Sequence, residues 1–435
     1  MKKIFFVFSF LFFLFISRLS VNAYSTPSIS FSADTSTVNV SYDKGNWNLV
    51  RPVIPNLNFP TGGITYWVST NGDDNNLGTS SNPFKTIQKG VSMAHAGDIV
   101  YIKAGVYPEM VAISNSGSST NPLVVSSAPG DLGNVKVVAT SIGPVIMINN
   151  NAQYVWINGL VIEGTKDKTG FSQVDEDFGA NGISWWNGAG HGKATNNVVY
   201  DNMHCGLKEL GHGGNTFTFI GNIVFNNGTD AHDHGFYFGD YDTLIDGNIV
   251  FDNAGWGLHL YSAPTRFTVT RNIIIKNFFS GILVAGSNSK FYNNVSAYNG
   301  NGGGIMYFRA GAVNNDIKNN IFAFNNVDGV IDNGGGSNNT DDYNIYTKQP
   351  NYAGSGVIVG SHEIYADPKF VNPVIGDFRL QSTSPAKNAG SDGKDLGAFA
   401  TTSIRQPINI SDFHLLLSTF TSIFDYNQLV ANFGR

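Results

Sequence analysis

The chain has 435 residues, a net charge of −6 at pH 7, and charged side chains at only 13% of its positions. The negative charge argues against nucleic acid as a partner, and the 50 glycines favour turns and sheets over helices. A single cysteine, Cys205, excludes a disulfide framework, so an extended hydrophobic core must stabilise the fold.

The first 23 residues have the pattern of a secretory signal peptide. Lys2 and Lys3 form a basic start, residues 4–16 are an apolar run, and residues 21–23 are a small-residue cleavage site. The apolar run is short for a membrane-spanning helix, and no later segment is apolar enough to cross a bilayer. We therefore expect an exported protein, secreted or at the cell surface, without a membrane contact after cleavage.

The next segments are expected to lead into a repetitive fold. Residues 24–60 are rich in Ser, Thr, Asn and Pro and are expected to form a linker or an edge strand. After them, Phe84, Ile87, Val91 and Ala94 have helical spacing. A short amphipathic helix there would cover the open end of a solenoid, which otherwise exposes its core and unpaired backbone.

Asparagine recurs at intervals of 22–26 residues, at Asn197, Asn222, Asn248, Asn272, Asn294, Asn320 and Asn344. A second asparagine follows each of the first six after five positions, at Asn202, Asn227, Asn253, Asn277, Asn299 and Asn325. A repeat of this length is the signature of a solenoid. Equivalent asparagines then stack, and their amides can hydrogen-bond along the axis. The pattern predicts an all-β fold over residues 61–400, a parallel β-helix in which each repeat forms one coil.

Each coil has a second strand, and these strands align on a glycine. They begin at Gly182, Gly206, Gly235, Gly257, Gly281 and Gly304. The residue after each glycine is apolar and is expected to point inward. Because side chains alternate across a strand, the following residues should face solvent: Ser184, Lys208, Tyr237, His259, Leu283 and Met306. Coils are about 4.8 Å apart, so Lys208, Tyr237 and His259 should form a row about 10 Å long.

Histidines concentrate around this row, with six of the nine between residues 191 and 259. The densest segment is TDAHDHGFYFGDYD, residues 229–242, and its insertion relative to neighbouring coils should hang over the same sheet. It contains Asp230, His232, Asp233, His234 and Asp240.

Residues 66–399 resemble the secreted right-handed parallel β-helix proteins with the pectin lyase-like fold, which include polysaccharide lyases and C5-epimerases. The resemblance rests on the asparagine and glycine repeats, and it implies a single-stranded right-handed parallel β-helix. It also implies an extended groove for an acidic polysaccharide, whose uronates such proteins commonly cleave by β-elimination.

β-Elimination needs a base for the C5 proton, a cation or donor for the enolate, and an acid for the leaving oxygen. Tyr237 and His259 are the candidate base and acid, Lys208 would neutralise the carboxylate, and His234 lies near them. The alternative is an ordinary outward column whose members only pack on their neighbours.

The segment Asp230-Ala231-His232-Asp233 resembles the Asp-Pro-His-Asp motif of mannuronan C5-epimerases, with alanine in place of proline. The resemblance implies catalytic roles for Asp230, His232 and Asp233. A polar turn capped by an aspartate is the alternative.

Candidate substrate-binding residues are Trp186, Asp240 and Tyr261. Alternation places Trp185 in the core and leaves Trp186 as a platform for a sugar ring.

A divalent cation is a further possibility. His232 and His234 would point the same way if they lay on one strand, and Asp175, Glu176 and Asp177 could bind calcium. No third ligand accompanies the two histidines at a fixed spacing, so no metal site is assigned.

The C-terminal part has two expected roles. Residues 377–399 would close the far end of the solenoid. Residues 401–435 contain a 13-residue duplication, INISDFHLLLSTF against TSIFDYNQLVANF, that resembles the helices of a dockerin. Both acidic calcium loops are missing. We expect a degenerate anchoring or dimerising tail that binds a cell-surface or scaffold partner.

The sequence therefore predicts an exported carbohydrate-active protein that cleaves an acidic polysaccharide by β-elimination. A mannuronan-type C5-epimerase and a non-catalytic glycan-binding protein or adhesin at the cell surface are the alternatives.

Overall fold

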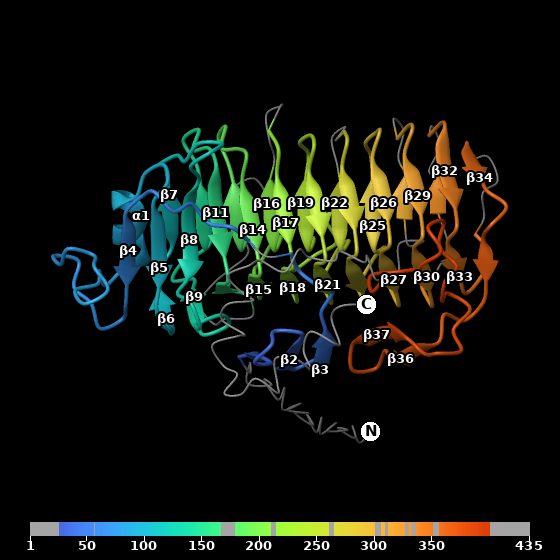
Figure 1. Ribbon diagram of the computed structural model, residues 1–435, viewed down its shortest axis with the longest axis horizontal. Coiled ribbons are helices and arrows are strands. Elements are labelled where there is room, and N and C mark those ends of the chain that lie inside the picture. The colour runs from blue at the N-terminus through green and yellow to red at the C-terminus, as the bar shows by residue number, and fades with distance from the viewer. Residues whose placement is uncertain are drawn as a thin grey trace, which may run out of the picture.

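The computed structural model describes residues 26–55, 57–166, 179–209, 215–260, 265–300, 306–308, 312–326, 330–332, 336–350 and 356–400. Three long parallel sheets wind around one apolar core (Figure 1). The predicted all-β parallel β-helix is confirmed, because each coil adds one strand to each sheet and pairs in parallel with the next coil.

The nine-stranded sheet carries the column of interest. Its strands are β7 (Val111–Ile113), β10 (Ile146–Ile148), β13 (Ile183–Trp185), β16 (Leu207–Glu209), β19 (Phe236–Phe238), β22 (Leu258–Leu260), β25 (Ile282–Val284), β28 (Met306–Phe308) and β31 (Val330–Asp332).

The twelve-stranded sheet follows it in each coil. Its strands are β4 (Thr65–Val68), β5 (Ile99–Ile102), β8 (Leu123–Ser127), β11 (Val155–Asn158), β14 (Lys193–Thr195), β17 (Thr218–Ile220), β20 (Leu244–Asp246), β23 (Thr268–Thr270), β26 (Lys290–Tyr292), β29 (Asp316–Lys318), β32 (Asn339–Asp342) and β34 (Val357–Val359).

The eleven-stranded sheet completes the coil. Its strands are β6 (Gly105–Pro108), β9 (Val135–Val138), β12 (Val161–Glu163), β15 (Val198–Tyr200), β18 (Ile223–Phe225), β21 (Ile249–Phe251), β24 (Ile273–Ile275), β27 (Val295–Ala297), β30 (Ile321–Ala323), β33 (Ile345–Tyr346) and β35 (Ile364–Tyr365).

Both predicted asparagine series form buried ladders at the turns. The Nδ2 group of Asn222 donates to Oδ1 of Asn248 at 2.9 Å, and that oxygen also accepts the backbone N–H of Asn222. The second series, from Asn202 on, repeats the amide-to-amide bond in each coil. The first ladder ends at Asn344, whose N–H donates to the carboxylate of Glu363 at 3.1 Å. Every rung therefore satisfies a buried amide that the turn would otherwise leave unpaired.

The predicted helix is present as α1 (Ile87–Met93). Thr86 caps it by accepting the N–H of Lys89, and Ile87 and Val91 are buried against the first strands. The amphipathic spacing thus covers the N-terminal end of the core. Within the described residues, no helix is long and apolar enough to cross a membrane.

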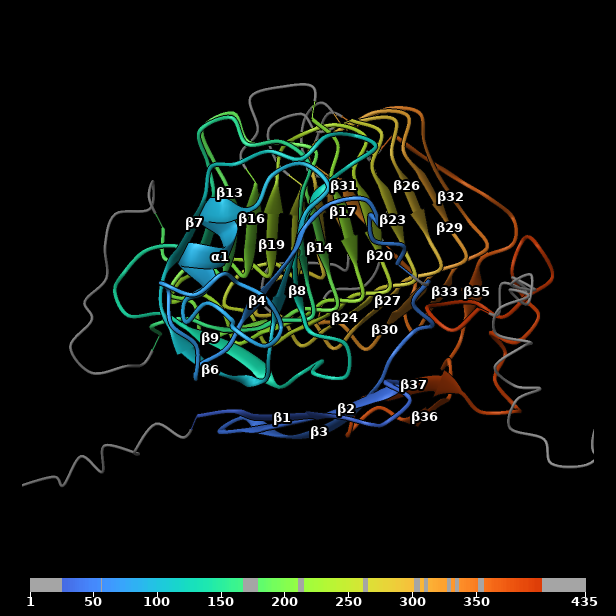
Figure 2. The same ribbon diagram turned by 60° about the vertical axis from the view of Figure 1, so that its left-hand side comes forward.

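A second apolar core covers the outward face of the eleven-stranded sheet (Figure 2). It contains Tyr200 and Phe225 from the solenoid, and Tyr42, Trp47 and Leu49 from an antiparallel sheet of β1 (Ser28–Phe31), β2 (Thr37–Tyr42) and β3 (Gly45–Val50). Where the sequence suggested a linker or a lone edge strand, the described part of residues 24–60 thus holds a covering sheet. In β2 and β3, buried apolar residues alternate with exposed ones, and the buried ones pack on the apolar outward face of the eleven-stranded sheet.

The segment after the last coil joins the same layer. Strands β36 (Phe370–Asn372) and β37 (Asp377–Leu380) form a hairpin, and Phe378 and Leu396 pack into the second core. The backbone N–H of Asn48 donates to the carbonyl of Ile375, so the hairpin is tied to β3. The expectation that residues 377–399 close the end of the solenoid is therefore wrong. Their apolar side chains are buried beside β1–β3 instead, and burial of apolar surface stabilises this position.

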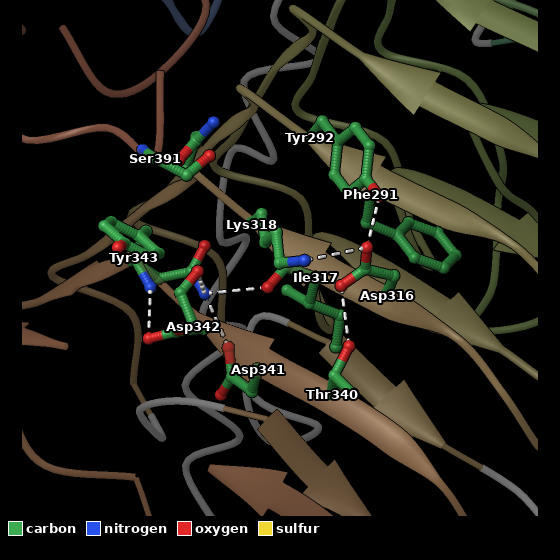
Figure 3. A network of polar contacts seen from close by, with 12 residues as sticks. Phe291, Tyr292, Asp316, Ile317, Lys318, Thr340, Asp341, Asp342, Tyr343 and Ser391 are labelled. Carbon is green, nitrogen blue, oxygen red and sulfur yellow. Dashed lines mark hydrogen bonds and ion pairs between the residues drawn. The ribbon is translucent and has the colours of Figure 1, made fainter. Parts of the chain in front are cut away.

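The outward face of the twelve-stranded sheet carries partly exposed polar side chains in its C-terminal half. Near its C-terminal end, Asp316 accepts hydrogen bonds from Tyr292, from Thr340 at 2.6 Å and from Lys318 at 3.2 Å (Figure 3). The Lys318 side chain is 37% exposed and that of Asp316 is 27% exposed. Such solvated ion pairs contribute little stability.

Candidate active site

The predicted row of three side chains is present on the outward face of the nine-stranded sheet. The strand register pairs Lys208 with Tyr237 and Tyr237 with His259. The Lys208 ammonium lies 5.5 Å from the centre of the Tyr237 ring, and the rings of Tyr237 and His259 are 4.9 Å apart. The prediction that these residues are neighbours is confirmed.

The predicted outward column continues past His259 to Leu283 and Met306, and it is wrong at β28. Leu283 of β25 pairs with Tyr307 of β28, and Met306 pairs with Ile282 instead. The run of glycines before Ile305 allows two alignments, and the sequence alone favoured the other one.

The row is covered rather than solvent-facing, so that part of the prediction is wrong. Lys208 is 8% exposed and His259 is 7% exposed, whereas Tyr237 is half-buried. The turn residues His234 and Trp256 lie over them, with ring centres 4.3 Å and 5.0 Å from that of His259. Both residues directly precede an aligned glycine, Gly235 or Gly257, in the turns that also hold the second asparagine ladder.

Two histidines are joined by a short hydrogen bond at the centre of this cover. Nδ1 of His259 lies 2.6 Å from Nε2 of His234, and Nδ1 of His234 accepts the backbone N–H of Trp256. Because His234 accepts at Nδ1, its proton is on Nε2 and is donated to His259, which then carries its own proton on Nε2. Burial, followed by the positive charges of His259, His232 and Lys208, holds the pKa of His234 well below its usual range. His234 is therefore neutral at pH 7 in this arrangement.

A cavity of about 360 Å³ opens beside the Lys208 end of the row. Lys208, Ser184, Trp186, Asn181 and Met147 contribute to its walls. It thus combines one cation, several polar groups and an aromatic ring, a composition common in ligand sites. Trp186 lines the cavity, as a platform for a sugar ring would.

Trp185, the neighbour of Trp186, points the opposite way. It is 1% exposed and packs edge-on against Phe217 and Phe219 inside the solenoid. The predicted division between the two tryptophans is confirmed.

A pair of buried carboxyl groups lies at the end of β16 and was missed by the sequence analysis. Glu209 is 1% exposed, and its Oε2 accepts the backbone N–H groups of Gly239 and Asp240. Burial and the negative charge of Asp240 raise the pKa of Glu209 well above its usual range. The sequence contained a sign of this pair. The strand GLKE places a glutamate at an inward position, where an apolar residue is expected. Asp240, proposed to bind substrate, is itself buried in this pair.

The epimerase-like segment folds as a turn. Oδ2 of Asp233 accepts the N–H groups of Thr229 at 2.8 Å and Asp230 at 3.1 Å. Nδ1 of His204 lies 3.6 Å from Oδ1 of Asp233. Burial raises the pKa of Asp233, against the opposing effect of the bonds from Thr229 and of His204. This is the capped turn that the sequence analysis weighed against a catalytic motif.

The remaining members of that segment do not join the row. The side chains of Asp230 and His232 are 46% and 79% exposed, and they contact each other, with Nδ1 of His232 3.6 Å from Oδ1 of Asp230. His232 and His234 lie in a turn rather than on one strand, so one is exposed and the other buried. The expectation that they point the same way is wrong.

No metal site is evident in the described residues, where no three His, Cys, Asp or Glu side chains converge to hold an ion. The calcium candidates Asp175, Glu176 and Asp177 lie outside that part of the chain, as does Tyr261. Cys205 is buried, and burial raises the pKa of its thiol to about 12.

Comparisons with known proteins agree with the fold. Residues 134–296 match the family described as right handed beta helix region, and residues 70–136 match a protein family of unknown function (DUF1565). The uncharacterized protein YwoF of Bacillus subtilis (strain 168) is 24% identical over 442 residues, covering 74% of this chain and 92% of the relative.

Two solved structures are similar at low sequence identity. Pectate lyase Pel9A has a TM-score of 0.54 at 16% identity, with 78% of this chain and 97% of that chain covered. The A-module of the Azotobacter vinelandii mannuronan C-5 epimerase AlgE4 has a TM-score of 0.47 at 16% identity, with 67% and 81% covered. At this identity, the likeness to Pel9A establishes the right-handed parallel β-helix fold alone.

Proposed function

We propose that the protein is an exported enzyme that cleaves an acidic, uronate-containing polysaccharide by β-elimination. The observation that carries this proposal is the row of Lys208, Tyr237 and His259, held under cover beside a cavity that Lys208 itself lines. The three groups are the types that the reaction needs, and burial of polar groups is costly unless it serves a purpose.

The contacts of the row suggest a role for each member. Lys208 supplies the positive charge that neutralises the uronate carboxylate and stabilises the enolate. The bond with His234 occupies Nδ1 of His259, so Nε2 is the nitrogen that can deliver a proton to the leaving oxygen. Tyr237, as its phenolate, is then the base that removes the C5 proton, after which the C4–C5 double bond forms and the C4–O bond breaks.

The test is an ultraviolet assay for the unsaturated uronyl end that β-elimination creates. Pectate is the first polymer to try because the similar solved structure is named a pectate lyase, followed by alginate and chondroitin. Assays with added calcium and with a chelator test the expected dependence on a divalent cation.

Three variants, Lys208→Met, Tyr237→Phe and His259→Gln, should each lower kcat about 10²–10⁴-fold. Matched controls remove the same chemical groups elsewhere: Lys290→Met and His95→Gln at exposed positions, and Tyr101→Phe at a half-exposed one. Full activity in the three row variants would overturn the site.

The same assay separates the alternatives. A change in uronate composition without new unsaturated ends would indicate a C5-epimerase, which shares the abstraction of the C5 proton. Binding of a polymer without any modification would indicate a glycan-binding protein or adhesin.

Export and anchoring are part of the proposal and need their own tests. If residues 1–23 are a signal peptide, the mature secreted protein begins at Tyr24, which N-terminal sequencing would reveal. If residues 401–435 anchor the protein to a cell-surface or scaffold partner, removal of this tail should release it from the cell fraction.

A further inference from the structure

A second cavity, of about 570 Å³, lies on the other side of the turn that carries His234. It is lined by three lysines, Lys44, Lys166 and Lys276, and we call it the lysine pocket. Lys44 is at the tip of the β2–β3 hairpin, Lys166 follows β12, and Lys276 follows β24. Thr229 and Asp230 of the turn complete one wall.

The carboxylate of Asp252 lines the pocket together with the three lysines. Tyr42 donates a hydrogen bond to Asp252, and Lys44 donates to the backbone carbonyl of Asp252 at 3.3 Å. Burial raises the pKa of Asp252, while the Tyr42 bond and the charges of Lys44, Lys276 and Lys166 oppose that rise. Asp252 is therefore held in place by the covering sheet rather than presented to a ligand.

The charge of the pocket is positive on a protein whose net charge is −6. Three lysines face two carboxylates, those of Asp252 and Asp230, which leaves one net positive charge. The Lys276 ammonium rests 4.4 Å above the Trp47 ring, an arrangement that positions the cation without neutralising it. Three lysines from distant segments thus line one cavity, and their positive charge attracts an anion to it.

One wall of the pocket is apolar. Phe278 lines it and is 50% exposed, so its ring is accessible to a ligand. Its ring contacts Phe279, which packs on Trp256, and Trp256 in turn packs on His259. A continuous line of aromatic rings thus connects the lysine pocket with the row of Lys208, Tyr237 and His259.

We propose that the lysine pocket is a non-catalytic glycan site that binds a uronate residue, with the carboxylate toward the lysines and a sugar face on Phe278. The inference rests on the proposed function in taking an acidic polysaccharide as the ligand. The combination of charge and an aromatic wall suits a carboxylated sugar better than a small inorganic anion, which would leave Phe278 unused. Engagement of one polymer at both sites would raise the affinity for long chains over short ones.

The test measures retention of the full-length protein in gels that contain pectate or alginate, by affinity electrophoresis. The Tyr237→Phe background prevents the polymer from being consumed. The double variant Lys44→Met/Lys276→Met should bind at least about tenfold more weakly, and Phe278→Ala should also weaken binding. The matched control is Lys85→Met/Lys290→Met, which removes the same charge from exposed positions and should bind as the parent does.

Added salt should weaken binding of the parent and have less effect on the double lysine variant, which a purely structural role of the lysines would not produce. The inference is overturned if the lysine variant is retained like its control, if neutral polymers bind equally well, or if the parent binds none of these polymers. A protein that cleaves no polymer yet is retained through Lys44 and Lys276 would refute the proposed function and leave the pocket standing.

Discussion

Two outward faces of the solenoid are covered, and the side chains under the two covers are opposite in character. On the eleven-stranded sheet, Tyr200, Phe225 and Phe251 are fully buried. Phe225 packs on Tyr42 and Phe251 on Trp47 of the covering strands, and Tyr200 stacks on Phe225. On the nine-stranded sheet, the buried outward residues include the polar Ser184, Lys208 and His259 beside one apolar Leu283, and His234 lies over His259.

The apolar cover of the eleven-stranded sheet stabilises the fold, whereas the polar cover of the nine-stranded sheet contains the groups available for chemistry. Burying a large apolar side chain contributes about 1.5–3 kcal/mol, whereas burying polar and charged groups costs free energy unless they are well paired. The shifted pKa values of His234 and Glu209 reflect that cost. Buried groups of this kind lower the stability of the fold, and they are typical of functional sites.

The largest effect should come from the apolar cover. Phe225→Ala removes a fully buried ring that stacks between Tyr200 and Phe251. We expect the free energy of unfolding to fall by about 3–5 kcal/mol, measured by urea denaturation. Phe278→Ala at an exposed position should change stability by less than about 0.5 kcal/mol. Equal effects of the two would mean that the second core contributes no more than a surface side chain.

A change at Glu209, which is buried at an inward position at the end of β16, should have the opposite sign. The pKa of Glu209 is raised in the folded state, so folded Glu209 stays protonated while the unfolded chain ionises above its ordinary value of 4.5. Stability is therefore lost as pH rises above about 4.5. Glu209→Gln keeps an acceptor for Gly239 and Asp240, and it should raise stability at pH 8 by about 1–2 kcal/mol.

Thermal unfolding at pH 5 and pH 8 measures this effect. The gain should be larger at pH 8, and Asp392→Asn, at an exposed carboxyl, should follow the parent at both values. A loss of stability in Glu209→Gln at pH 8 would show that the ionised carboxylate is needed in the folded protein.

The periodic part of this comparison was predictable from the sequence. The recurring asparagines mark the coils and the aligned glycines fix the register, so Lys208, Tyr237 and His259 could be placed on adjacent strands without coordinates. The cover of the eleven-stranded sheet also left a signal that went unused. Runs such as NIVFNN and NIIIKN are apolar at every strand position, which indicates burial on both faces.

The turns could not be placed in the same way. The turn that holds Asp230 is longer than its neighbours, so no period places Asp230, whereas His234 and Trp256 each directly precede an aligned glycine and only the direction of their rings was beyond the repeat. The segment from Asp230 to Asp233 follows local turn chemistry instead. The lysine pocket was also beyond the sequence, because Lys44 reaches it from the covering sheet, whose docking position no repeat specifies.

A smaller effect on stability is expected at the row itself. Lys208→Met keeps the length of a buried side chain and removes its charge, so the free energy of unfolding should stay equal or rise by about 1 kcal/mol. Together with the loss of turnover, this would separate activity from folding on the polar face. A parallel loss of stability and activity would assign Lys208 a structural role.

The smallest effect concerns whether the polar cover stays closed in solution. Cys205 is buried beside His234, whose backbone N–H lies 3.4 Å from Sγ, and burial raises the pKa of the thiol from 9.0 to about 12. The thiolate is the reactive form, so alkylation of the folded protein at pH 8 should be roughly 10³-fold slower than that of the unfolded chain. Mass spectrometry after timed treatment with iodoacetamide measures the ratio. Rapid alkylation without unfolding would mean that the polar cover opens in solution, and the contrast between the two covered faces would then be one of dynamics as well as composition.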